Sequence, residues 1–164
     1  MLFLNKEDSA KYLHSFCPQK MWAGLECTEL IFAQEDFSCC IEYEDQDGQY
    51  YYLAKSITNW LMPFSTSILI ATEYGIWPSR ENLHLFQRVR SSYSETTPIY
   101  MTPGHVFTGL ESSDLITFLH LYMLFGWGGV ISTDGSKSGF FSHDGWFGLL
   151  GEGCEMVAHD WYYG

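Results

Sequence analysis

Ser142, His143 and Asp144 are the three residue types with which a serine hydrolase activates its nucleophile. Consecutive side chains of an extended chain point to alternate faces, however, whereas the members of a triad must meet in space. The chain also contains no Gly-x-Ser-x-Gly turn that would expose the serine. We therefore predict a structural role, in which a strand ends at Ser142 and Asp144 caps the turn that follows.

The histidines are the other candidates for chemistry. None of the six forms an H-x-H or H-x-x-x-H pair with an acid in register, so no metal site is predicted. His105 and His143 lie near the ends of predicted strands, next to loops that often carry function. A small enzyme with a site on His105, His143 and Asp144, with Arg88 nearby, is the alternative that these positions leave open.

An acidic run between residues 42 and 52 is interleaved with tyrosines. Its glycine and glutamates do not fall at the positions that a calcium-binding EF-hand loop needs. Tyrosine beside carboxylate is a composition suited to protein interfaces, because tyrosine is rigid and amphipathic. We predict that this run is the tip of a hairpin that binds a basic protein partner. The predicted contact residues are Glu42, Tyr43, Glu44, Asp45, Asp47, Tyr50 and Tyr52.

The pattern of apolar residues and turn signals predicts the elements that would position these groups. A short helix is expected over 6–16, and a helix opened by Pro78-Ser79 is expected to leave Arg80, Arg88 and Arg90 in solvent. A central helix should follow Glu111 and stop at Gly126. Strands are expected at 37–43, 49–54, 67–72, 105–108, 130–133 and 139–142, with the first two and the last two forming hairpins. Residues 144–164 contain no pattern that places them beyond a short helix or turn near Trp146.

This order of elements predicts a single α+β domain over residues 1–164, with a mixed or mostly antiparallel sheet packed on one face by helices. The 164 residues are 46% hydrophobic, enough for a real core, yet the net charge is −12. Three arginines in such an acidic domain do not make a nucleic-acid surface, so direct nucleic-acid binding is not expected. The five cysteines show no disulfide or zinc spacing, and no membrane segment or cofactor motif is seen, which favours the cytoplasm.

The C-terminal half resembles a family of small bacterial proteins of undetermined function. The residues that carry the resemblance are Trp77-Pro78-Ser79, Glu81-Asn82, His84-Leu85, Ser92-Tyr93, Pro103-Gly104-His105, Phe107, Glu111, Asp114-Leu115, Phe118-Leu119, Gly126-Trp127, Ser142-His143-Asp144 and Trp146. The family usually carries acids where this chain has Gly128 and Gly145. The resemblance implies a bacterial source and an α+β domain. In size and acidity the chain is also similar to bacterial toxin-immunity proteins.

Charge and composition together favour a binding protein over an enzyme. An acidic surface is steered toward a basic one, and a nuclease site must be basic to attract phosphate. The expected function is therefore neutralisation of a basic protein partner, as an immunity protein against a nuclease toxin would provide. Besides the small enzyme, an inhibitor that mimics nucleic acid is the remaining alternative.

Overall fold

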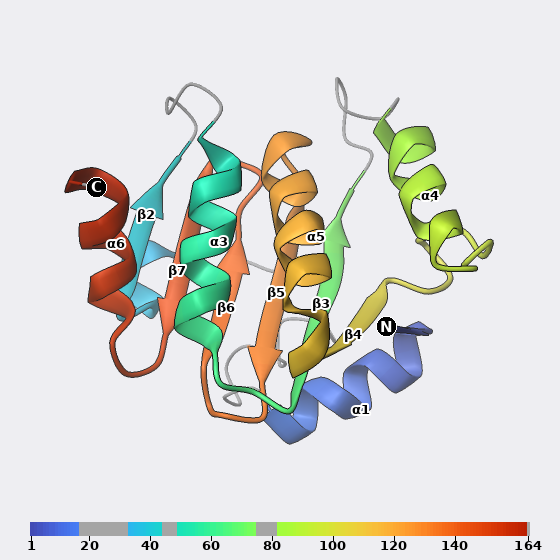
Figure 1. The fold of residues 1–164 in the computed structure, drawn as a ribbon, viewed down its shortest axis with the longest axis horizontal. Coiled ribbons are helices and arrows are strands. Elements are labelled where there is room, and N and C mark those ends of the chain that lie inside the picture. The colour runs from blue at the N-terminus through green and yellow to red at the C-terminus, as the bar shows by residue number, and fades with distance from the viewer. Residues whose placement is uncertain (17–32, 44–48, 75–81, 164) are drawn as a thin grey trace.

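The computed structural model describes residues 1–16, 33–43, 49–74 and 82–163, and Figure 1 shows an antiparallel sheet with helices packed against it. Within these residues seven strands pair in the order β1-β4-β3-β5-β6-β7-β2, every pair antiparallel. The strands are β1 (Leu2–Leu4), β2 (Cys39–Glu42), β3 (Thr66–Glu73), β4 (Gly104–Thr108), β5 (Gly128–Thr133), β6 (Ser138–Phe141) and β7 (Trp146–Leu150). The helices are α1 (Lys6–Phe16), α3 (Tyr50–Leu61), α4 (Asn82–Ser92), α5 (Ser112–Leu124) and α6 (Cys154–Tyr163), with short 3₁₀ turns at Gln34–Asp36 and Gly109–Glu111.

The strands alternate between two hydrophobic clusters, as the two-residue period of a strand requires. On β3, Leu69 and Ala71 join the cluster that α3 and α5 cover, whereas Ile68 and Ile70 join the cluster that contains Leu13 of α1. The predicted α+β class with an antiparallel sheet is confirmed. The prediction placed helices on one face, and the structure adds α1 on the opposite face.

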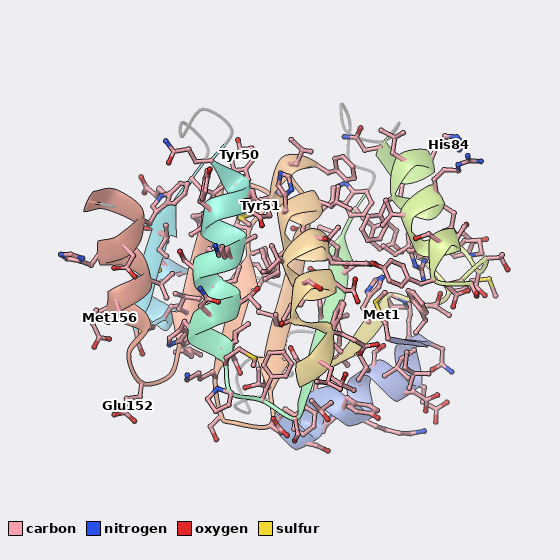
Figure 2. The ribbon with its side chains drawn as sticks, viewed as in Figure 1. Met1, Tyr50, Tyr51, His84, Glu152 and Met156 are labelled. Atoms are coloured by element: carbon pink, nitrogen blue, oxygen red, sulfur yellow. The ribbon has the colours of Figure 1, made fainter. Side chains whose placement is uncertain are left out.

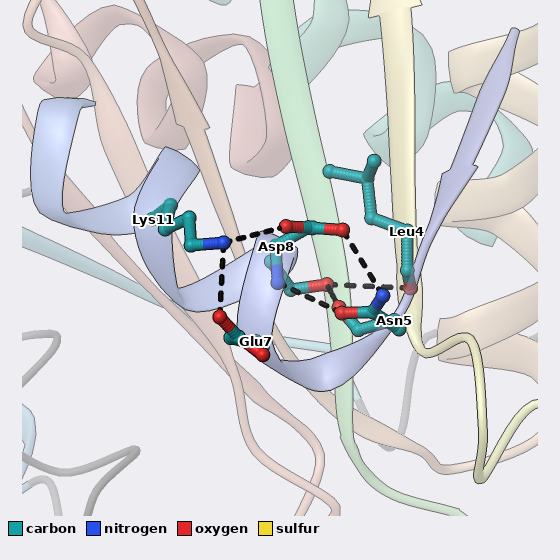
Figure 3. A network of polar contacts seen from close by, with 6 residues as sticks. Leu4, Asn5, Glu7, Asp8 and Lys11 are labelled. Carbon is teal, nitrogen blue, oxygen red and sulfur yellow. Dashed lines mark hydrogen bonds and ion pairs between the residues drawn. The ribbon is translucent and has the colours of Figure 1, made fainter.

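The start of α1 is stabilised by side chains close in sequence. The Asn5 Oδ1 accepts a hydrogen bond from the Asp8 amide at 2.9 Å, which satisfies one of the free N–H groups at a helix start. The Lys11 Nζ lies 2.9 Å from Asp8 Oδ1 and 3.0 Å from Glu7 Oε1 (Figure 3). The predicted helix over 6–16 is therefore confirmed with its bounds.

Most of the other predicted elements are also present. The predicted strand 67–72 lies within β3, 105–108 within β4 and 130–133 within β5. The hairpin of β5 and β6 pairs Val130 with Phe140, close to the predicted turn. The central helix ends as predicted at Gly126, whose φ of 61° is the left-handed conformation of a helix stop. The short helix expected near Trp146 is wrong, because Trp146–Leu150 form the strand β7, and only a turn is present, at 143–144. The helix α6 follows β7, in a segment for which no element was predicted.

The predicted strand at 49–54 is wrong, because residues Tyr50–Leu61 form the helix α3. Leu53, Ala54, Ile57 and Leu61 are buried together, and this spacing is that of one helix face rather than one strand face. β2 pairs instead with β7, Ile41 lying opposite Phe147. The acidic connection 44–48 lies outside the described residues.

Arg90 corrects a second prediction. It was expected to remain in solvent, but its side chain is fully buried. The reason is its spacing from Phe86, since residues four apart lie on the same face of a helix and Phe86 is core. Arg88 is exposed as predicted, while Ser79, Arg80 and Glu81 fall outside the described residues. No helix in the described part of the chain is long and apolar enough to cross a membrane.

A close approach between Phe37 and β7 gives a stability prediction. A Cβ built on Gly148 would lie 2.4 Å from the Phe37 ring, which stacks on Phe140 at 6.0 Å and contacts Trp146 at 5.7 Å. Because these neighbours restrict the ring, we expect Gly148→Ala to reduce the free energy of unfolding by about 1–3 kcal/mol in urea denaturation. The control is Gly135→Ala, whose Cβ would have its nearest neighbours at 3.6 Å. Equal stability of the two variants would contradict the prediction.

Candidate functional site

The ends of three strands meet along one edge of the sheet. β2, β3 and β6 run in the same direction, because each is separated from the next by an odd number of antiparallel neighbours. Their C-terminal ends, and the N-terminus of α3, therefore lie at one end of the molecule, the upper end in Figure 1. Three carboxylates belong to this end, from Glu42 at the end of β2, Glu73 at the end of β3 and Asp144 in the β6–β7 turn. We call it the acidic end.

His143 lies between two of these carboxylates. Its Nδ1 is 2.6 Å from Glu73 Oε2, and its Nε2 is 3.4 Å from Asp144 Oδ1. The three side chains are partly open to solvent, with exposed fractions of 40% for His143, 35% for Glu73 and 70% for Asp144. Glu73 and His143 are 70 positions apart in the sequence, so no local pattern indicated the pair.

The β6–β7 turn confirms that Ser142 has a structural role, but the capping role predicted for Asp144 belongs to Ser142. The Ser142 Oγ accepts a hydrogen bond from the Asp144 amide at 3.1 Å, so the serine rather than the aspartate caps the turn. The Ser142 carbonyl accepts a hydrogen bond from the Tyr43 hydroxyl at 3.1 Å. Both nitrogens of the His143 ring face carboxylates instead of the Ser142 hydroxyl. The geometry is thus not that of a hydrolase triad.

The tyrosines of the predicted contact set fall into two environments. Tyr43 is 2% exposed, which removes it from any contact surface, and its ring meets Tyr50 edge-on at 5.8 Å. Tyr50, Tyr51 and Tyr52 form the first turn of α3, and Figure 2 shows Tyr50 and Tyr51 at the upper end of that helix. Tyr52 is 65% exposed.

The exposed aromatic surface extends from α3 onto α5. Tyr51 is 46% exposed and contacts the ring of His120 at 6.0 Å and that of Tyr52 at 5.7 Å. Partial burial lowers the pKa of His120, which favours its neutral, less hydrated form. Leu124, at the end of α5, is also exposed. Tyr51 was left out of the predicted contact set although it lies in the same run. His120 and Leu124 were absent because only the packing of α3 on α5 brings α5 residues beside Tyr51.

Of the predicted contact residues, Glu42, Tyr50 and Tyr52 lie at the acidic end with partly or largely exposed side chains. Glu44, Asp45 and Asp47 lie outside the described residues. The acids and tyrosines predicted to share a surface do so in part, but as a strand end and a helix start rather than as a hairpin tip.

His105 lies apart from His143. It pairs across the sheet with Leu69 of β3, whereas His143 contacts Glu73 of the same strand. Leu69 and Glu73 are four residues apart, so the two histidines are separated by about 13 Å along the strand, at roughly 3.3 Å per residue. His105 is fully buried among the rings of Phe3, Phe86 and Phe118. The structure therefore does not bring His105 together with His143 and Asp144, as the alternative of a small enzyme required.

Among the residues that the structure describes, no three histidine, cysteine or acidic side chains are arranged to hold a metal ion. Comparisons of the chain with protein-family models, with curated proteins and with solved structures found no match.

Proposed function

We propose that this chain is an acidic binding protein that neutralises a basic protein partner, and that it acts as an immunity protein against a bacterial nuclease toxin. The observation that carries the proposal is that carboxylates and exposed tyrosine rings occupy the same end of the molecule. Glu42, Glu73 and Asp144 supply the charge, and Tyr51 and Tyr52 supply apolar area.

This combination suits a tight interface with a basic surface. Aromatic side chains are the commonest anchors of binding energy, while charged groups at the rim mainly raise the rate of encounter. A net charge of −12 adds long-range attraction toward a cationic partner. A nuclease is a suitable partner because its active site must be basic to hold phosphate. An inhibitor that covers this active site faces the same positive charge and must therefore be acidic.

We place the contact at Glu42, Asp144, Tyr50, Tyr51 and Tyr52, with Glu44, Asp45 and Asp47 of the neighbouring connection as further acids. Tyr43 supports this surface from beneath through its hydrogen bond to Ser142. We assign Glu73 the role of orienting His143, because its Oε2 lies 2.6 Å from the His143 Nδ1.

We also propose that the protein acts in the cytoplasm of a bacterium. Cys39, Cys40 and Cys154 are free thiols, as expected in a reducing compartment. A nuclease toxin would reach its nucleic-acid substrate in the same compartment.

The proposal is tested with basic nuclease domains encoded by the source bacterium, measuring binding kinetics and nuclease inhibition. For the cognate domain we expect saturable inhibition and an association rate that falls at least tenfold between low and physiological ionic strength. Failure of every such domain to be inhibited would refute the toxin assignment. Inhibition of a DNA-binding protein without nuclease activity would instead favour a nucleic-acid mimic.

The surface is tested by charge reversal at opposite ends of the molecule. We expect the double variant Glu42→Lys, Asp144→Lys to slow association by about tenfold, and Tyr52→Ala to speed dissociation. The double variant Glu152→Lys, Glu155→Lys makes the same change of charge at two exposed sites, and Figure 2 shows Glu152 at the end opposite Tyr50. An equal effect of this control would show that net charge, and not the acidic end, governs binding.

A further inference from the structure

Two thiols from distant parts of the chain meet where the C-terminal helix packs on the edge of the sheet. Cys39 begins β2 and lies opposite Leu149 of β7 in the strand register. The chain then leaves β7 and turns back through Gly151 and Gly153, whose φ values of 136° and 77° favour glycine. Cys154 follows as the first residue of α6, which packs against β2 (Figure 1). This loop returns Cys154 to the strand that carries Cys39.

The two cysteines share one hydrophobic cluster. Cys154 is 3% exposed and belongs to the cluster that α3 and α5 cover, and the half-buried Cys39 packs against the same cluster. The Cys39 thiol donates a hydrogen bond to the sulfur of Cys154. The two sulfur atoms are therefore neighbours, although one residue is at position 39 and the other at position 154.

Cys40 is the neighbour of Cys39 in the sequence but not in space. Consecutive residues of a strand point to opposite faces of the sheet, and Cys40 accordingly packs against the cluster that contains Leu13 of α1. Its thiol donates a hydrogen bond to the Gln34 carbonyl at 3.1 Å. Among the cysteines that the structure describes, Cys39 and Cys154 are thus the pair whose sulfur atoms face each other.

The surroundings keep both of these thiols protonated. Burial, together with Cys154, Cys40 and Glu155, raises the pKa of Cys39 to about 11. Burial and Glu155 also raise the pKa of Cys154. A thiolate is disfavoured in this environment, whereas a disulfide is uncharged and suits the same apolar packing. At neutral pH the reduced pair therefore reacts only through a small thiolate fraction.

We propose that Cys39 and Cys154 form a redox-sensitive pair, which a two-electron oxidant such as hydrogen peroxide closes into a disulfide. Cys39 reacts first because it is the more exposed thiol. Its thiolate attacks one peroxide oxygen, the O–O bond breaks, and hydroxide leaves and is protonated to water. The Cys154 sulfur then attacks the resulting sulfenic acid at sulfur, the S–O bond breaks, and a second water leaves. Two thiols and one peroxide thus give one disulfide and two waters.

Both elements that carry the pair lie at the periphery of the fold. Within the described sheet β2 is an outermost strand that pairs with β7 alone, and α6 follows the last described strand. Small shifts of either element can therefore bring the sulfur atoms to the disulfide bond length of about 2 Å. The bond would tie the edge strand to α6 and close a long loop in the unfolded chain, which stabilises the folded state.

The proposal is tested on the whole chain by treatment with hydrogen peroxide, followed by peptide mapping without reduction. We expect a linked pair of peptides that contains Cys39 and Cys154, with a mass two hydrogens below that of the separate peptides. The oxidised chain should melt about 5–10 °C above the reduced chain, and dithiothreitol should reverse the shift. Because closure follows the thiolate fraction, its rate should rise about tenfold per pH unit between pH 7 and 9.

Variants at single cysteines separate this pair from the other thiols. Cys39→Ser and Cys154→Ser should each abolish the linked peptides and the rise in melting temperature, and the half-buried Cys39 site serves alone if the change at the buried Cys154 prevents folding. Cys40→Ser removes the adjacent thiol on the opposite face and should keep both signals. Absence of the link between Cys39 and Cys154 after treatment, linkage of Cys39 to a different cysteine, an unshifted melting temperature of the linked chain, or loss of the response in Cys40→Ser would each overturn the proposal.

Discussion

Replacing Phe86 with alanine is expected to reduce the free energy of unfolding by about 3–5 kcal/mol, measured by urea denaturation. Phe86 is 1% exposed, and its ring contacts His105, Phe118, Tyr122 and Trp127 at centroid distances between 4.8 and 5.8 Å. Truncation would remove the transfer free energy of the ring and leave a void.

Leu85 provides the control for Phe86 on the same helix. Its side chain is 55% exposed, so Leu85→Ala should change the free energy of unfolding by less than about 0.5 kcal/mol. Phe86→Leu should fall between the two, since it keeps part of the apolar volume. Similar losses for the changes at Leu85 and Phe86 would mean that α4 does not pack on the sheet through Phe86.

The second large effect is a pH dependence of stability that comes from His105. The unfolded chain has an ordinary histidine pKa of about 6.5, while burial lowers the pKa of His105 in the folded protein to about 3. Below pH 6.5 the unfolded state therefore takes up a proton that the folded state does not. The contribution is fully present above pH 6.5 and is lost as the pH falls toward 3, at about 1.4 kcal/mol per pH unit well inside this window.

The measurement compares the free energy of unfolding at pH 7, 6 and 5 for the wild-type chain and for His105→Leu. Between pH 7 and 5 the wild type should lose roughly 2 kcal/mol more than the variant. The other histidines titrate in both proteins and cancel in the difference. Parallel pH profiles would contradict the prediction. Should the variant not fold, the ring resonances of His105 in the wild type should show no protonation above about pH 4.

Local sequence patterns were sufficient to predict those strands and helices whose buried residues follow directly from the apolar pattern of the segment itself. β3 is a run of apolar and β-branched residues that is buried on both faces, and α5 has apolar residues around most of its circumference. The β5–β6 hairpin follows from its Asp134-Gly135 turn signal. At these positions local propensity and tertiary environment agree, so reading the residues in order was enough.

The prediction failed where distant segments decided the outcome. Three consecutive tyrosines at 50–52 have a high strand propensity, yet packing against α5 makes this segment helical, and β7 takes the place beside β2. β7 is a short strand whose Trp146 and Gly148 fit against Phe37, a contact that no local period reveals. Arg90 was expected in solvent because arginine usually is, but in the interior its two terminal nitrogens donate hydrogen bonds to the loop carbonyls of Thr97 and Thr102.

The same division applies to the candidate functional site and to the core beside it. The sequence alone determined the charge of −12, the α+β class and the concentration of acids and tyrosines between residues 42 and 52, because these depend on composition and on neighbours in the chain. Only the tertiary structure decided that Glu73 lies against His143, that Tyr43 is buried, and that His105 shares its surroundings with Arg90 and Tyr122. Burial and electrostatic environment are set by residues far along the chain, from 15 positions between Arg90 and His105 to 99 between Tyr43 and Ser142. Tertiary packing is what brings them within contact distance.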